Sequence, residues 1–385
     1  MTSPMRWQIA LFALIRTVFN TAYRMIYPFL SVFAAGLGVD LNVIALALAN
    51  RSLVGALGPF LAVVADRRGR KVGMLVGLGL FTLGAALVWL RPTFPAFMGM
   101  LLLTTLGKYG FDPAMQAYLG DRVPYEQRGL ALSATELGWS LSFFVGVPLM
   151  GMLMARGTWM TPFLGLMLAG LLAAVALFWL VPREVVERAD RPGMWQNLWS
   201  VLRYPPALAG LATGLTATIA NEVINLIFGV WMEDVHHLSI LALGGAAAVI
   251  GAAELSAEVL VGGTADRLGK ARAIRIGLMG NTLAALAFPL LGRTLPGALV
   301  SLFLFFLTFE FLLVSSIPMM TEIMPGARAT LMAFNVAGLS LGRAVGAVLA
   351  PSLYAQGIAL SAAVAVAFNL LAMVSLGYVQ RRLTL

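Results

Sequence analysis

The chain has 385 residues, of which 60% are apolar and 11% are charged, and its formal net charge is +9. A soluble domain would carry roughly a quarter charged residues, so the composition excludes a soluble globular protein and predicts one that lies in lipid. The sequence holds no cysteine, which excludes disulfides, thiol chemistry and cysteine metal sites. Its basic residues fall in short loops between apolar runs, so we expect the positive charge to set topology rather than to bind nucleic acid.

Apolar runs long enough to cross a bilayer follow one another along the whole chain. A hydrocarbon core of about 30 Å needs about 20 helical residues, whereas barrel strands are about ten residues long with alternating polarity. The first run carries internal charges and exceeds the core of a signal peptide, so we expect a retained span. The pattern predicts an all-α integral membrane fold. The twelve expected spans are 7–33, 40–65, 72–90, 95–118, 130–155, 159–181, 206–231, 239–263, 273–292, 296–318, 329–353 and 357–380.

The positions of Arg and Lys predict the orientation of these spans. The predicted outer loops hold only Arg91, Arg156 and Arg293, whereas the inner segments hold the remaining loop cations. Positive residues accumulate on the cytoplasmic side, so we expect both termini in the cytoplasm. The lack of cysteine and the preference for Arg over Lys favour a prokaryotic source, and hence a multi-pass protein of the cytoplasmic (inner) membrane.

Two polar hinges, 200 residues apart, each separate two apolar segments. An internal repeat of this period, in a chain this apolar, predicts two similar bundles of membrane helices joined head to tail. The hinges are Asp66-Arg67-Arg68-Gly69-Arg70-Lys71 and Asp266-Arg267-Leu268-Gly269-Lys270.

The expected domains follow from this repeat. We expect an N-terminal six-helix bundle at 1–181 and a C-terminal six-helix bundle at 206–385. The segment 182–205 is the longest connection, with mixed and solvated charges. We interpret it as a cytoplasmic linker without chemistry of its own.

The hinges resemble the Gly-x-x-x-Asp-Arg-x-Gly-Arg-Arg pattern of the major facilitator superfamily, although Ala62 replaces the leading glycine that Gly262 keeps in the second copy. The segment 121–129 is similar to the Pro-x-Glu-x-Arg-Gly loop of that family, and 322–328 is its repeat copy. The resemblance implies two pseudo-symmetric bundles and a conformational latch; positive-inside anchoring alone is the alternative. The expected latch residues are Asp66, Arg67, Gly69, Arg70, Asp121, Asp266 and Arg267.

The fifth span resembles an altered form of the glycine-proline motif of drug and metabolite exporters. It reads Gly138…Gly146-Val147-Pro148, and the glycines Gly338 and Gly346 echo it in the eleventh span. Small residues next to proline also permit close helix packing and a bend, which is the general alternative. Proton-coupled exporters of this kind usually carry an arginine about twelve residues before a proline in the fourth span, and Leu101 stands there.

Ionisable residues inside the spans are the strongest functional signal, because a charge at mid-bilayer costs about 3 kcal/mol or more. Those of the first half are mostly basic and those of the second half mostly acidic. Opposed charges of this kind predict a polar cavity between the two bundles. The residues concerned are Arg16, Arg24, Arg51, Lys108, Asp112, Glu136, Glu222, Glu254, Glu258, Glu310 and Arg343.

Polar residues at matching points of the repeat predict where a substrate binds. In the first span Asn20 and Arg24 lie one turn apart, and in the seventh span Glu222 stands among asparagines. Arg16 fits a structural or a functional role equally, and Lys108 is expected to pair with Asp112. In the family, the first, fourth, seventh and tenth spans line the cavity. The expected cavity residues are Asn20, Tyr23, Arg24, Tyr27, Lys108, Asn221 and Asn225.

Four acidic residues are candidates for proton coupling. Glu254 and Glu258 are one turn apart and should not both ionise, although a salt bridge to Arg343 would remove this site. Glu310 stands among phenylalanines, where an ionised carboxylate is costly. Glu222 completes the set.

Together these patterns predict a secondary transporter that exports a small amphipathic molecule by proton-coupled alternating access. The alternative is uptake or flipping of an anionic metabolite or lysophospholipid through the arginines of the first span. A membrane-embedded enzyme would need a nucleophile or metal set at one face, and none stands there; His236 and His237 are adjacent in a short loop. We expect no cofactor and no metal. The expected partners are a small-molecule substrate, protons or another cation, and the lipid bilayer, and we expect the protein to be a monomer.

Overall fold

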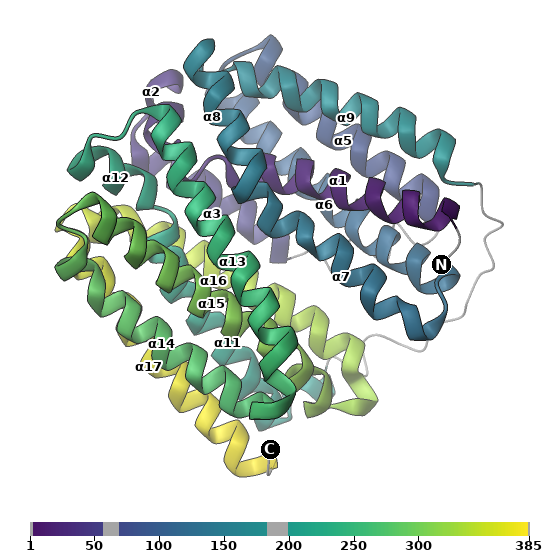
Figure 1. Ribbon diagram of the computed structural model, residues 1–385, viewed down its shortest axis with the longest axis vertical. Coiled ribbons are helices and arrows are strands. Elements are labelled where there is room, and N and C mark those ends of the chain that lie inside the picture. Colours follow the sequence, from purple (N-terminus) through teal and green to yellow (C-terminus); the bar gives the residue numbers. More distant parts are fainter. Residues whose placement is uncertain (1–2, 57–68, 183–198, 384–385) are drawn as a thin grey trace. The chain divides into compact units, whose positions relative to one another are not determined.

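The computed structural model describes residues 3–56, 69–182 and 199–383, and these form helices without any strand (Figure 1). Each predicted span coincides with one or more helices over its described residues, and residues 57–65 of the span expected at 40–65 lie outside them. The linker expected at 182–205 lies mostly outside the described residues. The all-helical fold is therefore confirmed.

The helices of the first half begin and end close to the predicted limits. They are α1 (Ser3–Arg24), α2 (Leu30–Leu37), α3 (Leu41–Ala56), α5 (Arg70–Leu90), α6 (Phe94–Arg122), α7 (Tyr125–Leu141), the π-helical segment η2 (Ser142–Gly146), α8 (Val147–Arg156) and α9 (Thr161–Leu180).

The second half repeats the pattern. Its helices are α11 (Pro205–Asn225), α12 (Phe228–His236), α13 (Ile240–Leu268), α14 (Lys270–Leu291), α15 (Leu295–Ile323), the 3₁₀ turn η3 (Pro325–Ala327), α16 (Arg328–Tyr354) and α17 (Ile358–Leu383).

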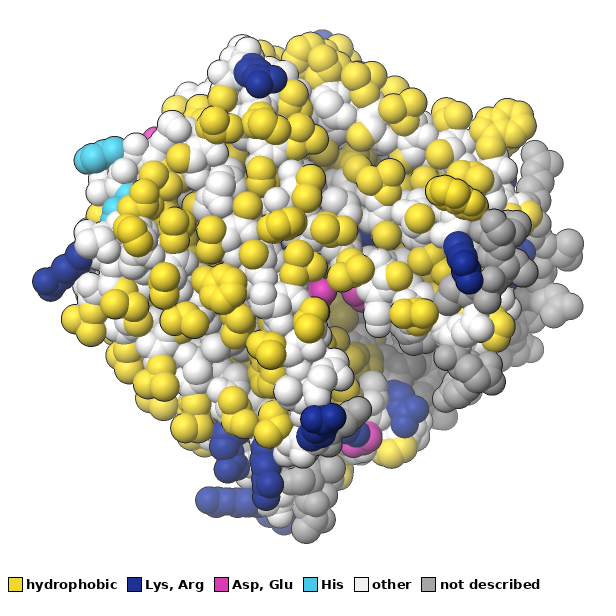
Figure 2. All heavy atoms as spheres, in the orientation of Figure 1, with side chains coloured by type: hydrophobic (Ala, Val, Ile, Leu, Met, Phe, Trp, Pro, Cys, Tyr) yellow, Lys and Arg dark blue, Asp and Glu magenta, His cyan; other side chains and the backbone are white. Residues whose placement is uncertain are grey.

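The surface fits a lipid solvent. Among the described residues, nine helices are long and apolar enough to cross a membrane, and α2 with α3 forms a further pair bent by 109°. Hydrophobic side chains cover most of the face in Figure 2, and Lys and Arg gather toward its margins. Large apolar side chains such as Trp179 and Val259 are about four-fifths exposed, at 80% and 77%. Such a surface is typical of a protein in contact with lipid; the count of twelve crossings and the cytoplasmic termini stay predictions.

Two predicted spans are broken rather than continuous. The span expected at 7–33 divides into α1 and α2, and the span expected at 206–231 divides into α11 and α12, which continues to His236. Each break follows a polar cluster, at Arg24 in the first case and at Asn225 in the second. Interrupted helices are tolerated in membranes where the freed backbone lies inside the protein or beside a cavity. The breaks therefore mark the polar clusters as places to look for a ligand.

The chain divides into two compact units. Unit 1 comprises Met1–Ala47, Leu57–Ala189 and Ser239–Gly251, and unit 2 comprises Leu48–Ala56, Asp190–Leu238 and Ala252–Leu385. The first part of α13 thus belongs with unit 1 and the last part of α3 with unit 2. The predicted domains 1–181 and 206–385 stay a prediction.

Glycines bring the helices of unit 1 into close contact. A Cβ atom on Gly138 of α7 would lie 2.9 Å from Cβ of Arg16 on α1, and one on Gly146 would lie 1.9 Å from the hydroxyl of Thr21. Between α5 and α6, a Cβ on Gly107 would lie 2.5 Å from the carbonyl oxygen of Gly77. Small residues permit such approaches between membrane helices.

The same device recurs between α11 and α16 of unit 2. A Cβ on Gly346 would lie 2.6 Å from Cβ of Glu222, and one on Gly342 would lie 2.6 Å from the carbonyl oxygen of Leu215. The predicted echo of Gly146 by Gly346 is therefore visible in the packing. Gly338 has more room, since its nearest neighbour is 3.9 Å away, and Gly342 makes the contact instead.

Candidate functional site

Ion pairs join the hinges to the next helix in both units. In unit 1, Nε of Arg70 lies 3.5 Å from Oδ2 of Asp121, and both residues belong to the expected latch set. In unit 2, Lys270 pairs with Glu322 at the corresponding place, which the sequence analysis missed although 322–328 was known as the repeat copy. Gly69 and Gly269 precede α5 and α14 with φ angles of 92° and 79°, where L side chains are rare.

Other parts of the predicted latch are not described. Asp66 and Arg67 lie outside the described residues, as does the side chain of Asp266, whereas Arg267 is exposed near the end of α13. The latch role of this set stays a prediction.

Lys71 of the first hinge stabilises the C-terminus of α9. Its Nζ donates to the carbonyl oxygen of Phe178 at 2.6 Å and lies 4.7 Å from the centre of the Phe178 ring. The amide of Gln8 donates to the carbonyl oxygen of Leu180 at 2.9 Å, and Tyr118 donates to Gln8 at 3.0 Å. The last carbonyls of a helix need such donors and favour a cation. Part of the hinge charge thus anchors helix ends.

A charge network occupies the interior of unit 1. Nζ of Lys108 lies 2.6 Å from Oδ2 of Asp112, so the pair expected from the sequence is present. Arg16 of α1 lies between two carboxylates, 3.3 Å from Asp112 and 2.7 Å from Glu136. Arg16 thus lies where α1, α6 and α7 meet, a place that fits both the structural and the functional role expected from the sequence.

Asn20 lies one turn beyond Arg16 and is fully buried. Neither its amide nitrogen nor its amide oxygen has a hydrogen-bond partner among the described residues. A buried amide without partners costs on the order of 1–3 kcal/mol. Asn20 therefore retains capacity to bind a water molecule or a polar group of a ligand.

Arg24 is held by aromatic rings. Its guanidinium carbon lies 4.2 Å from the ring centre of Trp139 and 3.6 Å from that of Phe143, and Nη1 donates to the carbonyl oxygen of Trp139 at 3.0 Å. The ring centres of Tyr23 and Trp139 are 6.5 Å apart, and Tyr27 is buried at the break after α1. The ring faces attract the guanidinium electrostatically, more strongly where water is excluded.

The π-helical segment η2 places the partners of Arg24. Pro148 is the second residue of α8, just after η2, and lacks the N–H that a regular helix would donate to the preceding turn. Inside η2, the hydroxyl of Ser142 donates to the carbonyl oxygen of Trp139 at 2.5 Å. Trp139 thus accepts hydrogen bonds from both Ser142 and Arg24. Segments of this kind are frequent at functional sites.

The second polar cluster ends α11 in unit 2. Glu222 is 1% exposed, and the amide of Asn225 donates to its Oε2 at 3.1 Å. The side-chain oxygens of Asn221 and Asn225 have no partner among the described residues. A buried carboxylate thus stands next to two amide oxygens that can accept further hydrogen bonds, at the break between α11 and α12.

The remaining candidates lie elsewhere in unit 2. Glu254 is buried on α13 and Glu258 is half-buried one turn later, so the two carboxylates keep the spacing read from the sequence. Glu310 is 6% exposed on α15, among the buried rings of Phe305, Phe306 and Phe309.

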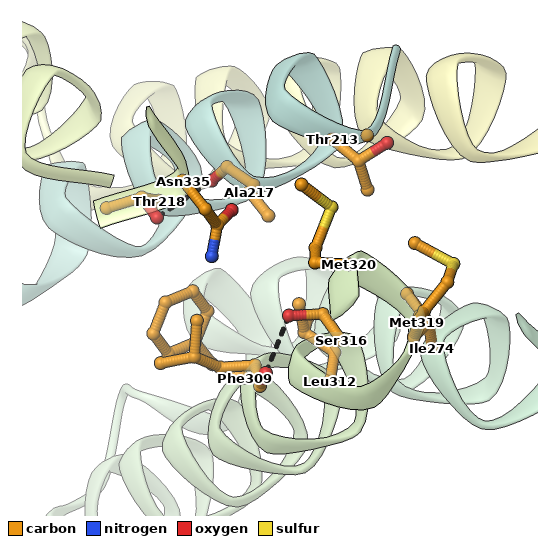
Figure 3. A pocket seen from close by; sticks show the side chains of 13 residues that line it. Thr213, Ala217, Thr218, Ile274, Phe309, Leu312, Ser316, Met319, Met320 and Asn335 are labelled. Carbon is orange, nitrogen blue, oxygen red and sulfur yellow. Dashed lines mark hydrogen bonds between the residues drawn. The ribbon is translucent and has the colours of Figure 1, made fainter. Parts of the chain in front are cut away.

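A small cavity lies within unit 2, between α11, α14, α15 and α16 (Figure 3). Asn335 and Phe309 stand on opposite sides of it, and Thr213 and Ser316 add hydroxyl groups. The space has room for about one water molecule. It is too small for a substrate.

The sequence analysis also missed a buried amide pair. The amide nitrogen of Asn369 on α17 donates to Oδ1 of Asn281 on α14 at 2.8 Å, and Asn281 in turn donates to the carbonyl oxygen of Phe305 at 2.7 Å. Both asparagines are fully buried. An asparagine in each of two otherwise apolar spans was the available signal. Hydrogen bonds between membrane helices tie α14, α15 and α17 together here.

Comparison with known proteins agrees with the helical fold and with the family resemblance of the hinges. A sequence model of the Major Facilitator Superfamily matches residues 12–320. The chain belongs to the major facilitator superfamily. It is therefore a membrane transporter that works on some substrate by alternating access.

Three curated proteins of Bacillus subtilis (strain 168) are similar over much of this facilitator's length. The MFS-type transporter YceJ is 25% identical over 90% of this chain and 89% of its own length. YbcL is 23% identical over 77% of this chain and 76% of its own length. YwfA is 25% identical over 69% of this chain. The matched part covers 66% of YwfA, just under two thirds of its length.

Solved structures show the same fold. A bacterial homologue of the human lysosomal transporter Spinster, in an inward-facing and occupied conformation, has a TM-score of 0.79 and 16% identity, over 99% of this chain and 98% of that chain. The human organic anion transporter MFSD10 (TETRAN) has a TM-score of 0.71 and 18% identity, over 98% of this chain and all of that one.

The amide pair gives a first prediction. Asn369→Ala leaves Asn281 with an unpaired buried oxygen, so we expect a loss of about 1–2 kcal/mol in unfolding free energy. Thermal unfolding of the purified protein in detergent measures it. The matched control is the double variant Asn281→Leu/Asn369→Leu, which removes both polar partners and should lose less than Asn369→Ala. A double variant that is less stable than the single variant contradicts this assignment.

Proposed function

We propose that this facilitator exports a small amphipathic molecule, a drug-like compound or a metabolite, in exchange for protons. The observation that carries the proposal is Glu222, a carboxylate that is 1% exposed at the break between α11 and α12. A buried ionisable residue inside a membrane helix is costly and is usually functional. A carboxylate that can take up a proton there is suited to couple transport to a proton gradient.

The surroundings of Glu222 support this role. Asn225 donates to one carboxylate oxygen at 3.1 Å, and an amide can hold the residue in place whether it is ionised or protonated. The backbone of α16 passes close by at Gly346, so the carboxylate has little freedom to leave. The unfilled side-chain oxygens of Asn221 and Asn225 can accept hydrogen bonds from a substrate or from water.

The corresponding break in the first half carries a second polar cluster. Asn20 and Arg24 stand before the break between α1 and α2, and we propose that they orient a polar group of the substrate. Trp139 and Phe143, which flank Arg24, provide flat apolar surface for its apolar part. Glu310 is the second proposed coupling residue, and Glu254 with Glu258 the third.

In the proposed cycle, Glu222 takes up a proton from water on the outer side. Substrate and proton compete for the site, so the proton enters as the substrate leaves. The transporter alternates between inward-facing and outward-facing states. Arg70–Asp121 and Lys270–Glu322, at the ends of helices in the two units, are the proposed contacts that stabilise one of these states.

The proton role of Glu222 has a direct test. Purified protein in proteoliposomes is given a pH gradient and a mixed panel of cationic dyes, sugars and lysophospholipids. Glu222→Gln keeps the size and the hydrogen bond to Asn225 but cannot release a proton, so we expect pH-driven transport to be lost while substrate binding remains. Glu233→Gln, on α12 outside the cluster, is the control and should behave as wild type. Unchanged pH-driven transport in Glu222→Gln disproves its coupling role.

A second function is favoured by the arginines of the first span. Arg24, held between aromatic rings, and Arg16 could bind the phosphate or carboxylate of an anionic metabolite or lysophospholipid that is taken up or flipped. MFSD10 is described as an organic anion transporter, but at 18% identity that likeness concerns the fold alone.

Arg24→Lys and Arg24→Ala separate the two functions. If the substrate is anionic, Arg24→Ala should lose transport of anions and spare that of cations, and Arg24→Lys should retain part of the activity because the charge remains. If the substrate is a cationic amphipathic compound, the loss should affect cations as well. Uptake assays with one anionic and one cationic member of the panel give the answer, and wild-type rates for both in Arg24→Ala contradict any substrate role of this residue.

A further inference from the structure

Four exposed arginines lie at one edge of unit 2, where the start of α14 packs beside the end of α17. Arg272 and Arg275 belong to the first two turns of α14, and Arg381 and Arg382 belong to the last turn of α17. Arg275 donates a hydrogen bond to the side-chain oxygen of Gln380, so the two helix ends are neighbours. Lys and Arg side chains gather around this end in Figure 2, where Figure 1 marks the C-terminus. We call this set of four residues the arginine edge.

The helices that carry the arginine edge do not neutralise it. Neither α14 nor α17 contains an aspartate or a glutamate. Lys270, the first residue of α14, pairs with Glu322 of α15 and so has its own counter-charge. Among the described residues, Arg272 and Arg381 have no hydrogen bond or ion pair. Like charges gathered on one surface repel one another, and they attract an anionic partner.

The equivalent edge of unit 1 uses its cations within the protein. There α5 packs against α9, as α14 packs against α17 in unit 2. The only two cations of α5 are Arg70 and Lys71. Arg70 lies 3.5 Å from Asp121, and Lys71 donates to the carbonyl oxygen of Phe178 at 2.6 Å. The arginine edge is therefore a property of unit 2 and does not follow from the repeat.

Apolar residues continue the face of α14 that carries its two arginines. Ile276 follows Arg272, and Met279 follows Arg275, each after four residues, which is about one helical turn. Both apolar side chains are exposed. This face therefore changes from apolar to cationic toward the start of α14, as a helix does where it passes from lipid tails to headgroups.

The exposed face of α17 shows the same order. Val374 stands one turn before Tyr378, and Arg382 stands one turn after it, with all three exposed. The guanidinium carbon of Arg382 lies 5.6 Å from the centre of the Tyr378 ring. Tyrosines are enriched at the level of the lipid headgroups. Two adjacent helices thus place arginines at the same level, next to surface that suits acyl chains.

We propose that the arginine edge binds the headgroup of an anionic phospholipid. Arg272 and Arg381 contact the phosphate oxygens, which a guanidinium can bind with two parallel N–H groups. The acyl chains lie along the apolar faces of α14 and α17. Basic surfaces between membrane helices bind anionic headgroups in this way. The site goes beyond the proposed function, because neither the transported substrate nor a proton takes part in it.

Native mass spectrometry of the full-length protein in detergent tests this site. The protein is titrated with phosphatidylglycerol or with phosphatidylcholine, and the apparent Kd of the first bound lipid is measured. We expect phosphatidylglycerol to bind more tightly. A cation near an anionic lipid strengthens binding roughly fivefold. Arg272→Gln/Arg381→Gln should therefore weaken binding of phosphatidylglycerol roughly 25-fold. Equal affinity for the two lipids overturns the proposal.

Two matched variants separate the arginine edge from net charge and from folding. Arg91→Gln/Arg156→Gln removes the same charge from exposed positions of unit 1 and should bind phosphatidylglycerol as wild type does. Arg272→Lys/Arg381→Lys keeps both charges and should retain most of the affinity. A loss in the Arg91/Arg156 variant as large as that in Arg272→Gln/Arg381→Gln contradicts the site, and so does full affinity in the latter.

A soluble phosphate distinguishes a lipid site from a phosphate site. Inorganic phosphate and sn-glycerol 3-phosphate carry the anionic group without acyl chains, so neither should displace phosphatidylglycerol when added at the same concentration. Displacement by either compound contradicts a lipid as the occupant. No transported substrate enters these measurements, so their outcome does not depend on whether Glu222→Gln abolishes pH-driven transport.

Discussion

Charges and backbone polar groups in a chain whose solvent is lipid must find their partners inside the protein. This constraint explains most of what the two units do with their few ionisable residues. Arg16 lies between Asp112 and Glu136, Arg24 between two aromatic rings, and Glu222 next to an asparagine. Each of these arrangements stabilises a charge or a carboxyl group that would otherwise be too costly in lipid.

The repeat gives the two halves the same frame with different chemistry. Gly69 and Gly269 make the same turn, Arg70–Asp121 and Lys270–Glu322 make the same ion pair, and Gly146 and Gly346 bring equivalent helices together. The two halves differ in the residues before their helix breaks. An arginine precedes the break in the first half, and a carboxylate with asparagines precedes the break in the second half. A frame that is duplicated and then specialised is the usual construction of secondary transporters.

The helices and the repeat could be predicted from the sequence because hydrophobic length and turn residues are local signals. The contacts of Lys108 with Asp112 and of Arg70 with Asp121 were also predictable, the first from helical spacing and the second from the motif. The break after Asn225 was not, since Leu226 and Ile227 are as apolar as an intact helix would be. For the break after Arg24, Pro28 was a local signal that the sequence analysis missed. The π-helical segment before Pro148 and the sharing of Arg16 depend on how three helices meet. The pair Asn281–Asn369 joins residues 88 apart, and no local pattern reveals such a partner.

The central claim is that water reaches the polar clusters at both helix breaks. Because the chain has no cysteine, Asn20→Cys and Asn221→Cys can each be probed alone with a membrane-impermeant maleimide, in inverted and right-side-out vesicles. The account predicts that both positions react, and that reaction from one side falls when a transported substrate is present. If neither cysteine reacts from either side, the clusters are dry packing and the proposed site does not exist.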